Sequence, residues 1–165
     1  MRAAVLALVF LLLAPSVASA KVIGLPKLFE DVLPKVKDKT EVPVLLPQSY
    51  DSDATKHVPS GSGRKRGYTL SIAAIRNCGG ATACFIADFS AQRGGDAHFT
   101  RKVDLIRGHT GFFKPLSCGA SCSPPIIEWV QDGDLYSIQA HAGTKQQEKN
   151  RLRKMANSAI RRGPR

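Results

Sequence analysis

The stretch that decides the fold is IIEWVQDGDLYSI, from Ile126 to Ile138, because it carries the clearest local signal in the chain. Asp132-Gly133 is a dipeptide typical of a two-residue type I′ turn, and apolar residues alternate with polar ones on both sides of it. The turn predicts a single register with four cross-strand pairs, namely Gln131 with Asp134, Trp129 with Tyr136, Ile127 with Ile138, and Glu128 with Ser137. The face that carries the aromatic pair is expected to look into the core.

Period-two alternation predicts further strands before this hairpin. Two half-buried strands, Tyr68 to Ala74 and Phe85 to Ala91, are expected to join near Gly79-Gly80, with Phe85 and Phe89 both facing inward. The remaining short strands are predicted at Lys102–Ile106, Gly111–Lys114, Ile126–Gln131 and Leu135–Ala140. Because no connection between them is long enough for a helix, the sequence predicts an antiparallel meander of about five or six strands.

The segments on either side of the sheet predict helices, which makes the fold class α+β. An amphipathic pattern after Gly24 indicates a short N-terminal helix kinked or divided at Pro34, followed by an extended entry over Val42–Pro47. Residues 51–68 are rich in polar residues, glycine and serine and are predicted to be a mobile loop. The segment after Thr144 predicts a C-terminal helix packed on the sheet.

The first twenty residues, MRAAVLALVFLLLAPSVASA, have the pattern of a secretory signal peptide. The apolar run is shorter than the roughly 20 residues that a spanning helix needs. We therefore expect a protein that is exported to the bacterial periplasm or the medium, soluble once the signal is removed and not membrane-spanning. The rest is expected to form one domain, in which residues 21–66 (helix, extended entry and basic loop) join the sheet and helix of residues 67–165.

All four cysteines, Cys78, Cys84, Cys118 and Cys122, follow the predicted signal peptide. An even number of cysteines in an oxidising compartment predicts two disulfides. Local pairing is the simplest arrangement, although a crossed pairing that ties the first hairpin to the loop at Ser117 remains open. The spacings are not those of common zinc sites and include no Cys-x-x-Cys redox motif, so neither a metal nor another cofactor is predicted.

The hairpin motif Trp129-x3-Gly133-x2-Tyr136-x-Ile138, followed by a helix that carries Met155-Ala156-Asn157-Ser158, resembles the closing segment of a family of bacterial exported domains of unknown function. The Pro43–Pro47 piece resembles the proline-flanked entry of such domains. The resemblance implies an exported α+β domain, usually treated as a sensing or binding module, with no catalytic residues to carry over. This chain departs from the pattern in its four cysteines and its lack of a lipid-attachment cysteine.

Motifs for catalysis do not emerge from the sequence. The histidines at 57, 98, 109 and 141 are scattered, and there is no His-Glu-x-x-His or Gly-x-Ser-x-Gly pattern. Four carboxylates, Asp88, Asp96, Asp104 and Glu128, suggest no pairing by their spacing. We therefore expect a non-catalytic binding or envelope-structural domain held by two disulfides, with a small secreted enzyme of unrecognised site as an alternative.

Positive charge is the strongest compositional signal, with 24 basic and 13 acidic residues and a formal net charge of +11. Such a field favours anionic partners, which makes an electrostatic binding module for anionic envelope polymers or lipid head groups the first alternative function. Specific nucleic-acid recognition is not predicted, because the aromatic residues follow the phase of the buried face. The candidate anion-binding residues lie in two clusters, Arg64, Lys65, Arg66 and Arg151, Arg153, Lys154, Arg161, Arg162.

Overall fold

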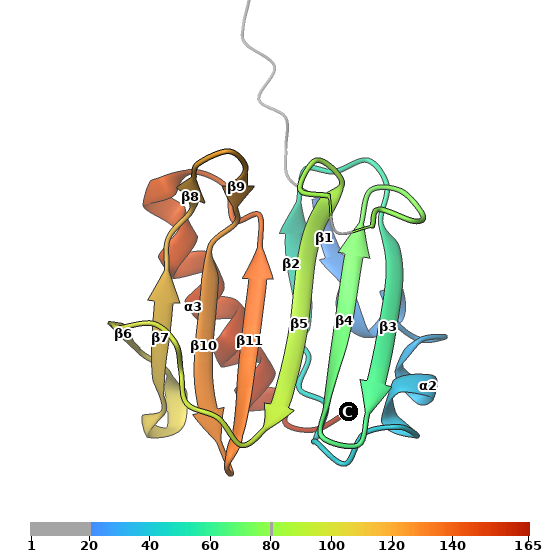
Figure 1. Ribbon diagram of the computed structural model, residues 1–165, viewed down its shortest axis with the longest axis vertical. Coiled ribbons are helices and arrows are strands. Elements are labelled where there is room, and N and C mark those ends of the chain that lie inside the picture. The colour runs from blue at the N-terminus through green and yellow to red at the C-terminus, as the bar shows by residue number, and fades with distance from the viewer. Residues whose placement is uncertain (1–20, 80) are drawn as a thin grey trace, which may run out of the picture.

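The structure is a computed structural model that describes residues 21–79 and 81–165. The signal peptide predicted for residues 1–20 lies outside these residues. The described chain is an α+β domain, as the sequence predicts, built on a seven-stranded antiparallel sheet with the order β3-β4-β5-β11-β10-β7-β6 (Figure 1). Its strands are β3 (Val58–Arg64), β4 (Gly67–Ala73), β5 (Phe85–Arg93), β6 (Arg101–Asp104), β7 (Thr110–Lys114), β10 (Ile126–Gln131) and β11 (Asp134–Ala140).

Shorter elements surround this sheet. Helix α3 (Lys145–Arg162) lies across one face (Figure 1). Two small antiparallel sheets pair β1 (Lys21–Gly24) with β2 (Ser49–Ser52), and β8 (Ser117–Cys118) with β9 (Cys122–Ser123). A 3-10 turn, η1 (Ile106–Gly108), follows β6.

The N-terminal region contains two short helices, so the predicted helix is divided rather than kinked. These are α1 (Leu25–Leu28) and α2 (Leu33–Lys37). Pro34 stands in the first turn of α2, where its missing N–H has no intrahelical partner to lose. The proline therefore starts a helix here.

The predicted meander is wrong in its topology, because the strands form two blocks. β3, β4 and β5 follow one another, and the chain then crosses to the far edge of the sheet at β6 and returns through β7 and β10 to β11. The two blocks join where β11 pairs with β5, from Asp134 opposite Arg93 to Ala140 opposite Ala87. Turn residues determine how neighbouring strands pair. They do not determine which strand distant in the sequence pairs with β5.

The number of strands exceeds the prediction because β3 occupies part of the expected mobile loop. Its glycines allow close packing: a methyl group on Gly63 would lie 2.5 Å from the carbonyl oxygen of Val36 in α2, and one on Gly61 would lie 2.7 Å from Val32. Glycine in a strand marks such a close approach. The glycines that make this segment resemble a loop therefore allow α2 to pack closely on the sheet.

The hairpin at Ile126–Ile138 has the predicted register in every pair. Asp132 and Gly133 have φ angles of 54° and 81°, as a type I′ turn requires. The rings of Trp129 and Tyr136 stack with centroids 5.4 Å apart, and both side chains are buried. The turn dipeptide thus sets the register between β10 and β11.

A β-bulge changes the phase of β5 near its start. The register between β4 and β5 shifts between Ile72 and Ala73, so that Ala73 pairs with Phe85. As a result Ile86 is buried, whereas Phe85 is only partly buried and does not join Phe89 in the core as predicted. A bulge redirects side chains in this way.

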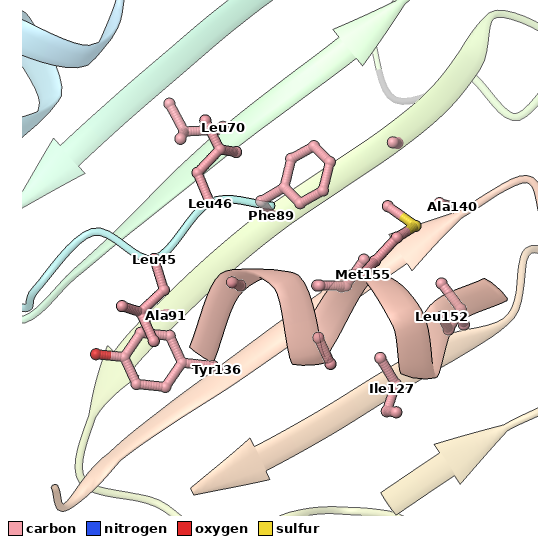
Figure 2. Close-up of a cluster of buried hydrophobic side chains, with 14 of the residues drawn as sticks. Leu45, Leu46, Leu70, Phe89, Ala91, Ile127, Tyr136, Ala140, Leu152 and Met155 are labelled. Atoms are coloured by element: carbon pink, nitrogen blue, oxygen red, sulfur yellow. The ribbon is translucent and has the colours of Figure 1, made fainter. Parts of the chain in front are cut away.

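A single apolar core lies between the sheet and the layer of helices and extended chain behind it. Figure 2 shows part of this core, to which Leu45 and Leu46 of the extended entry, Phe89 of β5, and Leu152 and Met155 of α3 contribute. The ring of Phe29 meets Phe89 edge-on at 6.3 Å. Residues 21–66 thus belong to the same core as the sheet.

Both disulfides are local, Cys78 with Cys84 and Cys118 with Cys122. The structure thus contains the simpler of the two pairings that the sequence left open. None of the described helices combines the length and the apolar character that crossing a bilayer requires.

Candidate binding groove beside helix α3

Helix α3 carries two parallel stripes of side chains. Its apolar stripe, including Leu152, Ala156 and Ile160, is fully buried against the sheet. A polar stripe lies next to it and consists of residues three or four positions apart, which fall on one helix face: Gln147, Asn150, Arg151, Lys154 and Ser158. Burial of the apolar stripe therefore fixes the direction in which the polar stripe points.

The polar stripe forms one wall of a groove, and β2 forms the other. The groove consists of two adjoining hollows of about 510 and 530 Å³, which share Tyr50, Asp51 and Arg151. The first hollow also contains Lys154 and Met155, and the second extends toward Asp53. Each hollow is large enough to hold a small ligand or a short stretch of a polymer.

Tyr50 and Ser158 fix the sides of this groove through backbone hydrogen bonds. The Tyr50 hydroxyl donates to the carbonyl oxygen of His141 at 2.6 Å, and the N–H of Gln48 donates to Ser158 Oγ at 3.0 Å. Burial raises the pKa of the Tyr50 phenol far above its usual value, with a further contribution from Asp53. The phenol is therefore neutral and structural at ordinary pH.

The cations of the groove have no carboxylate within 4 Å among the described residues. This holds for Arg151, which is partly buried, and for Lys154, which is exposed. The Arg151 guanidinium lies over Gly143, where a methyl group would be 3.0 Å from its central carbon. Neutral side chains that can donate hydrogen bonds, including Gln147 and Asn150, stand on the same wall. The groove can therefore hold an anionic group by charge and by neutral hydrogen bonds together.

The eight predicted anion-binding residues do not form one surface. Arg64 and Arg66 line a separate hollow of about 450 Å³ with Ser62 and Gln92. The neighbouring Lys65 instead points to Glu41, at 3.6 Å. Like Lys65, three further residues line none of the four hollows described for the structure, namely Arg153, Arg161 and Arg162. Only Arg151 and Lys154 of the C-terminal cluster therefore meet in a groove.

A second polar arrangement links Glu128 of β10 to the crossover before β6. The backbone N–H of His98 donates to Glu128 Oε2 at 2.8 Å, and its ring Nδ1 lies 3.1 Å from Oε1. The carboxylate side chain is only 8% exposed, whereas the His98 side chain is 69% exposed. This pair fastens a loop over the sheet, and its spacing of thirty residues left no signal in the sequence.

Residues 21–79 and 81–165 contain no cluster of three or more histidine, cysteine or acidic side chains arranged to hold a metal ion. Sequence reasoning also missed Tyr50, Gln147 and Asn150 as groove residues. The helical spacing from Arg151 could have identified the last two. Nothing local marks Tyr50, because its place beside α3 depends on the tertiary fold.

The fold and groove define a class: an α+β domain with one antiparallel sheet, helices on one face, two local disulfides and a polar groove beside its last helix. No protein-family model, no curated protein and no solved structure matches the chain. The resemblance noted in the sequence therefore stays a prediction, and the residues of the groove must carry any functional argument.

Proposed function

We propose that the protein is an exported, non-catalytic binding domain that holds an anionic envelope polymer in the groove beside α3. The observation that carries the proposal is the meeting of Arg151 and Lys154 in one groove, without a carboxylate within 4 Å of either among the described residues. Asp51 also lines both hollows, but neither cation forms an ion pair with it, so both can bind a ligand. The overall charge of +11 would attract such a ligand from a distance.

The shape of the groove favours a polymer over a lipid surface. The polar stripe runs along α3 from Gln147 to Ser158, so successive anionic groups of an extended chain would meet successive side chains. Membrane docking of a helix needs a free apolar face, and the apolar stripe of α3 is occupied by the core. The hydrogen bonds of Tyr50 and Ser158 to the backbone hold the two sides of the groove in place for a ligand.

The test is fluorescence-detected binding of a polyphosphate of defined length to the mature protein at several salt concentrations. We expect binding that weakens steeply with salt, because added salt screens the charges and reduces the gain from releasing counterions. The double variant R151A/K154A should lose about tenfold or more in affinity, since charge-assisted hydrogen bonds are worth about 1.5 to 3 kcal/mol each. R153A/R161A is the matched control, because it removes two charges from the same helix outside the groove.

Equal losses in both double variants would show that only net charge matters and would refute the groove. A third variant, R64A/K65A/R66A, tests the other predicted cluster. If this variant abolished binding while R151A/K154A retained it, the polymer site would lie at the hollow of Arg64 and Arg66 instead.

A further inference from the structure

The sheet has an open face, opposite to the face that α3 covers (Figure 1). Near the end of β4, a hollow of about 440 Å³ opens on this face, where β3, β4 and β5 meet residues 75–79. Its lining includes the apolar side chains of Val58, Ala73, Ile75 and Phe85 and five polar ones, those of Ser60, Ser71, Arg76, Asn77 and Asp88.

Asp88 is the carboxylate of this hollow. It pairs with Ser71 of β4 on one side and with Gln139 of β11 on the other, so its side chain lies among strands rather than at a flexible edge. The residue is partly buried, and no lysine or arginine lies within 4 Å of it among the described residues. Burial raises the pKa of Asp88, and the Ser71 hydroxyl, which can donate to the ionised carboxylate, opposes this rise. An ionised carboxylate here has no ion pair within 4 Å among the described residues, although Arg76 lines the same hollow.

The apolar side chains of the hollow lie on strands and on a segment that a disulfide joins to β5. Ile75 stands on the rim with 56% of its surface exposed, which is unusual for a large apolar side chain in this protein. Val58 and Phe85 are partly buried beside it. The disulfide between Cys78 and Cys84 ties the wall segment to the start of β5. An apolar chain can therefore pack on these walls without first ordering them.

We propose that this hollow binds a primary ammonium group carried on a short apolar chain, with Asp88 and Ser71 accepting its hydrogen bonds. An ammonium group has three donors and no acceptor, which suits a carboxylate and a hydroxyl oxygen. A divalent metal ion fits less well, because calcium takes six to eight oxygen ligands and a lone carboxylate supplies at most two. Phe85 borders both this hollow and the far hollow of the groove of Arg151, but the proposal does not depend on the proposed function.

Two sources can supply this chemistry, a free alkylamine and a lysine side chain of a peptide. The experiment is therefore a titration of the mature protein, followed by NMR, with pentylammonium and separately with a lysine whose backbone groups are blocked. Pentanol serves as the neutral analogue with the same chain. We expect both ammonium probes to shift amide signals of Ser71, Ala73 and Asp88, and pentanol to bind at least about tenfold more weakly. Binding of the lysine probe alone assigns a peptide source, and binding of pentylammonium alone assigns a small amine.

Two variants separate binding from folding. D88N should reduce ammonium affinity about tenfold or more while leaving thermal stability equal or higher, because it removes a desolvated charge. D104N is the matched control: it removes the same charge at Asp104, which is exposed and lines none of the four hollows, so the affinity should be unchanged. The proposal is overturned if neither ammonium probe binds, if pentanol binds as well, or if D88N binds like the wild type.

Discussion

Tyrosine hydroxyls join the extended entry to the sheet. The Tyr68 hydroxyl accepts from the N–H of Leu45 at 3.0 Å and donates to the carbonyl of the same residue at 3.1 Å. The Tyr136 hydroxyl donates to the carbonyl oxygen of Pro43 at 3.1 Å. Burial raises the pKa of both phenols far above their usual value, so they remain neutral donors. Two tyrosines of β4 and β11 therefore bind backbone groups of Val42–Pro47, which also pairs with the C-terminus through the bridge of Leu45 with Pro164.

The Tyr68 bonds can be tested with Y68F. Removing the hydroxyl leaves the buried N–H and carbonyl of Leu45 without their partner, which should lower the free energy of unfolding by about 1 to 3 kcal/mol in urea. Y50F is a useful comparison, because the hydroxyl of Tyr50 satisfies a single carbonyl nearer the surface and its loss should cost less. Equal stability of Y68F and the wild type would contradict this account.

Asp88 predicts a specific dependence of stability on pH. Its folded pKa lies above the ordinary value of 3.8, so the folded state binds its proton more tightly than the unfolded state does. Its contribution to stability is therefore present below pH 3.8 and is lost as the pH rises through the folded pKa. The Ser71 hydroxyl favours the ionised form and opposes this rise, and Arg76 is the charged group that lines the same hollow.

Urea unfolding of wild type and D88N across this pH range measures the effect. D88N should gain stability relative to the wild type as the pH rises from below 4 toward neutrality. A gap between the two proteins that narrowed with rising pH would have the wrong sign. D104N, on the exposed strand β6, is the control and should show no such trend.

At the scale of elements, the crossover between β5 and β6 determines the topology, and Glu128 fastens it. E128A removes the acceptor of the His98 N–H and leaves the space beneath the crossover unfilled. We expect faster hydrogen exchange at residues 94–100 and a loss of about 1 to 3 kcal/mol in the free energy of unfolding.

E128Q is the conservative comparison, because its amide oxygen can still accept from the His98 N–H. It should retain most of the exchange protection that E128A loses. If the amides of residues 94–100 exchanged at wild-type rates in both variants, the carboxylate would not fasten the crossover. Packing of these residues alone would then hold it.

The sequence predicts those elements that neighbouring residues determine. It does not predict those that depend on contacts between distant residues. The hairpin around Asp132-Gly133 was predicted to the residue, because a two-residue turn sets the register by itself. β3 was mistaken for a loop, because Gly61 and Gly63 are explained only by the distant helix α2. The pairing of β11 with β5 and the place of Tyr50 in the groove are likewise tertiary and have no local pattern.

At the scale of the whole molecule, the cationic and anionic side chains of the two proposed sites, which have no ion pair within 4 Å among the described residues, lie on opposite sides of the sheet. Arg151 and Lys154 lie on the side that α3 covers, and Asp88 lies on the open side. The two proposed sites should therefore act as separate units, although Phe85 lines both the far hollow of the groove and the hollow of Asp88.

This separation predicts additive behaviour in a double-mutant comparison. D88N should leave polyphosphate affinity within about twofold of the wild type, and R151A/K154A should leave pentylammonium affinity within the same limit. The combined variant should show both losses, each at its single-variant size. F85A is the variant expected to affect both sites, because its ring borders both. If D88N instead changed polyphosphate affinity as strongly as R151A/K154A did, the two hollows would form one continuous site around the edge of the sheet.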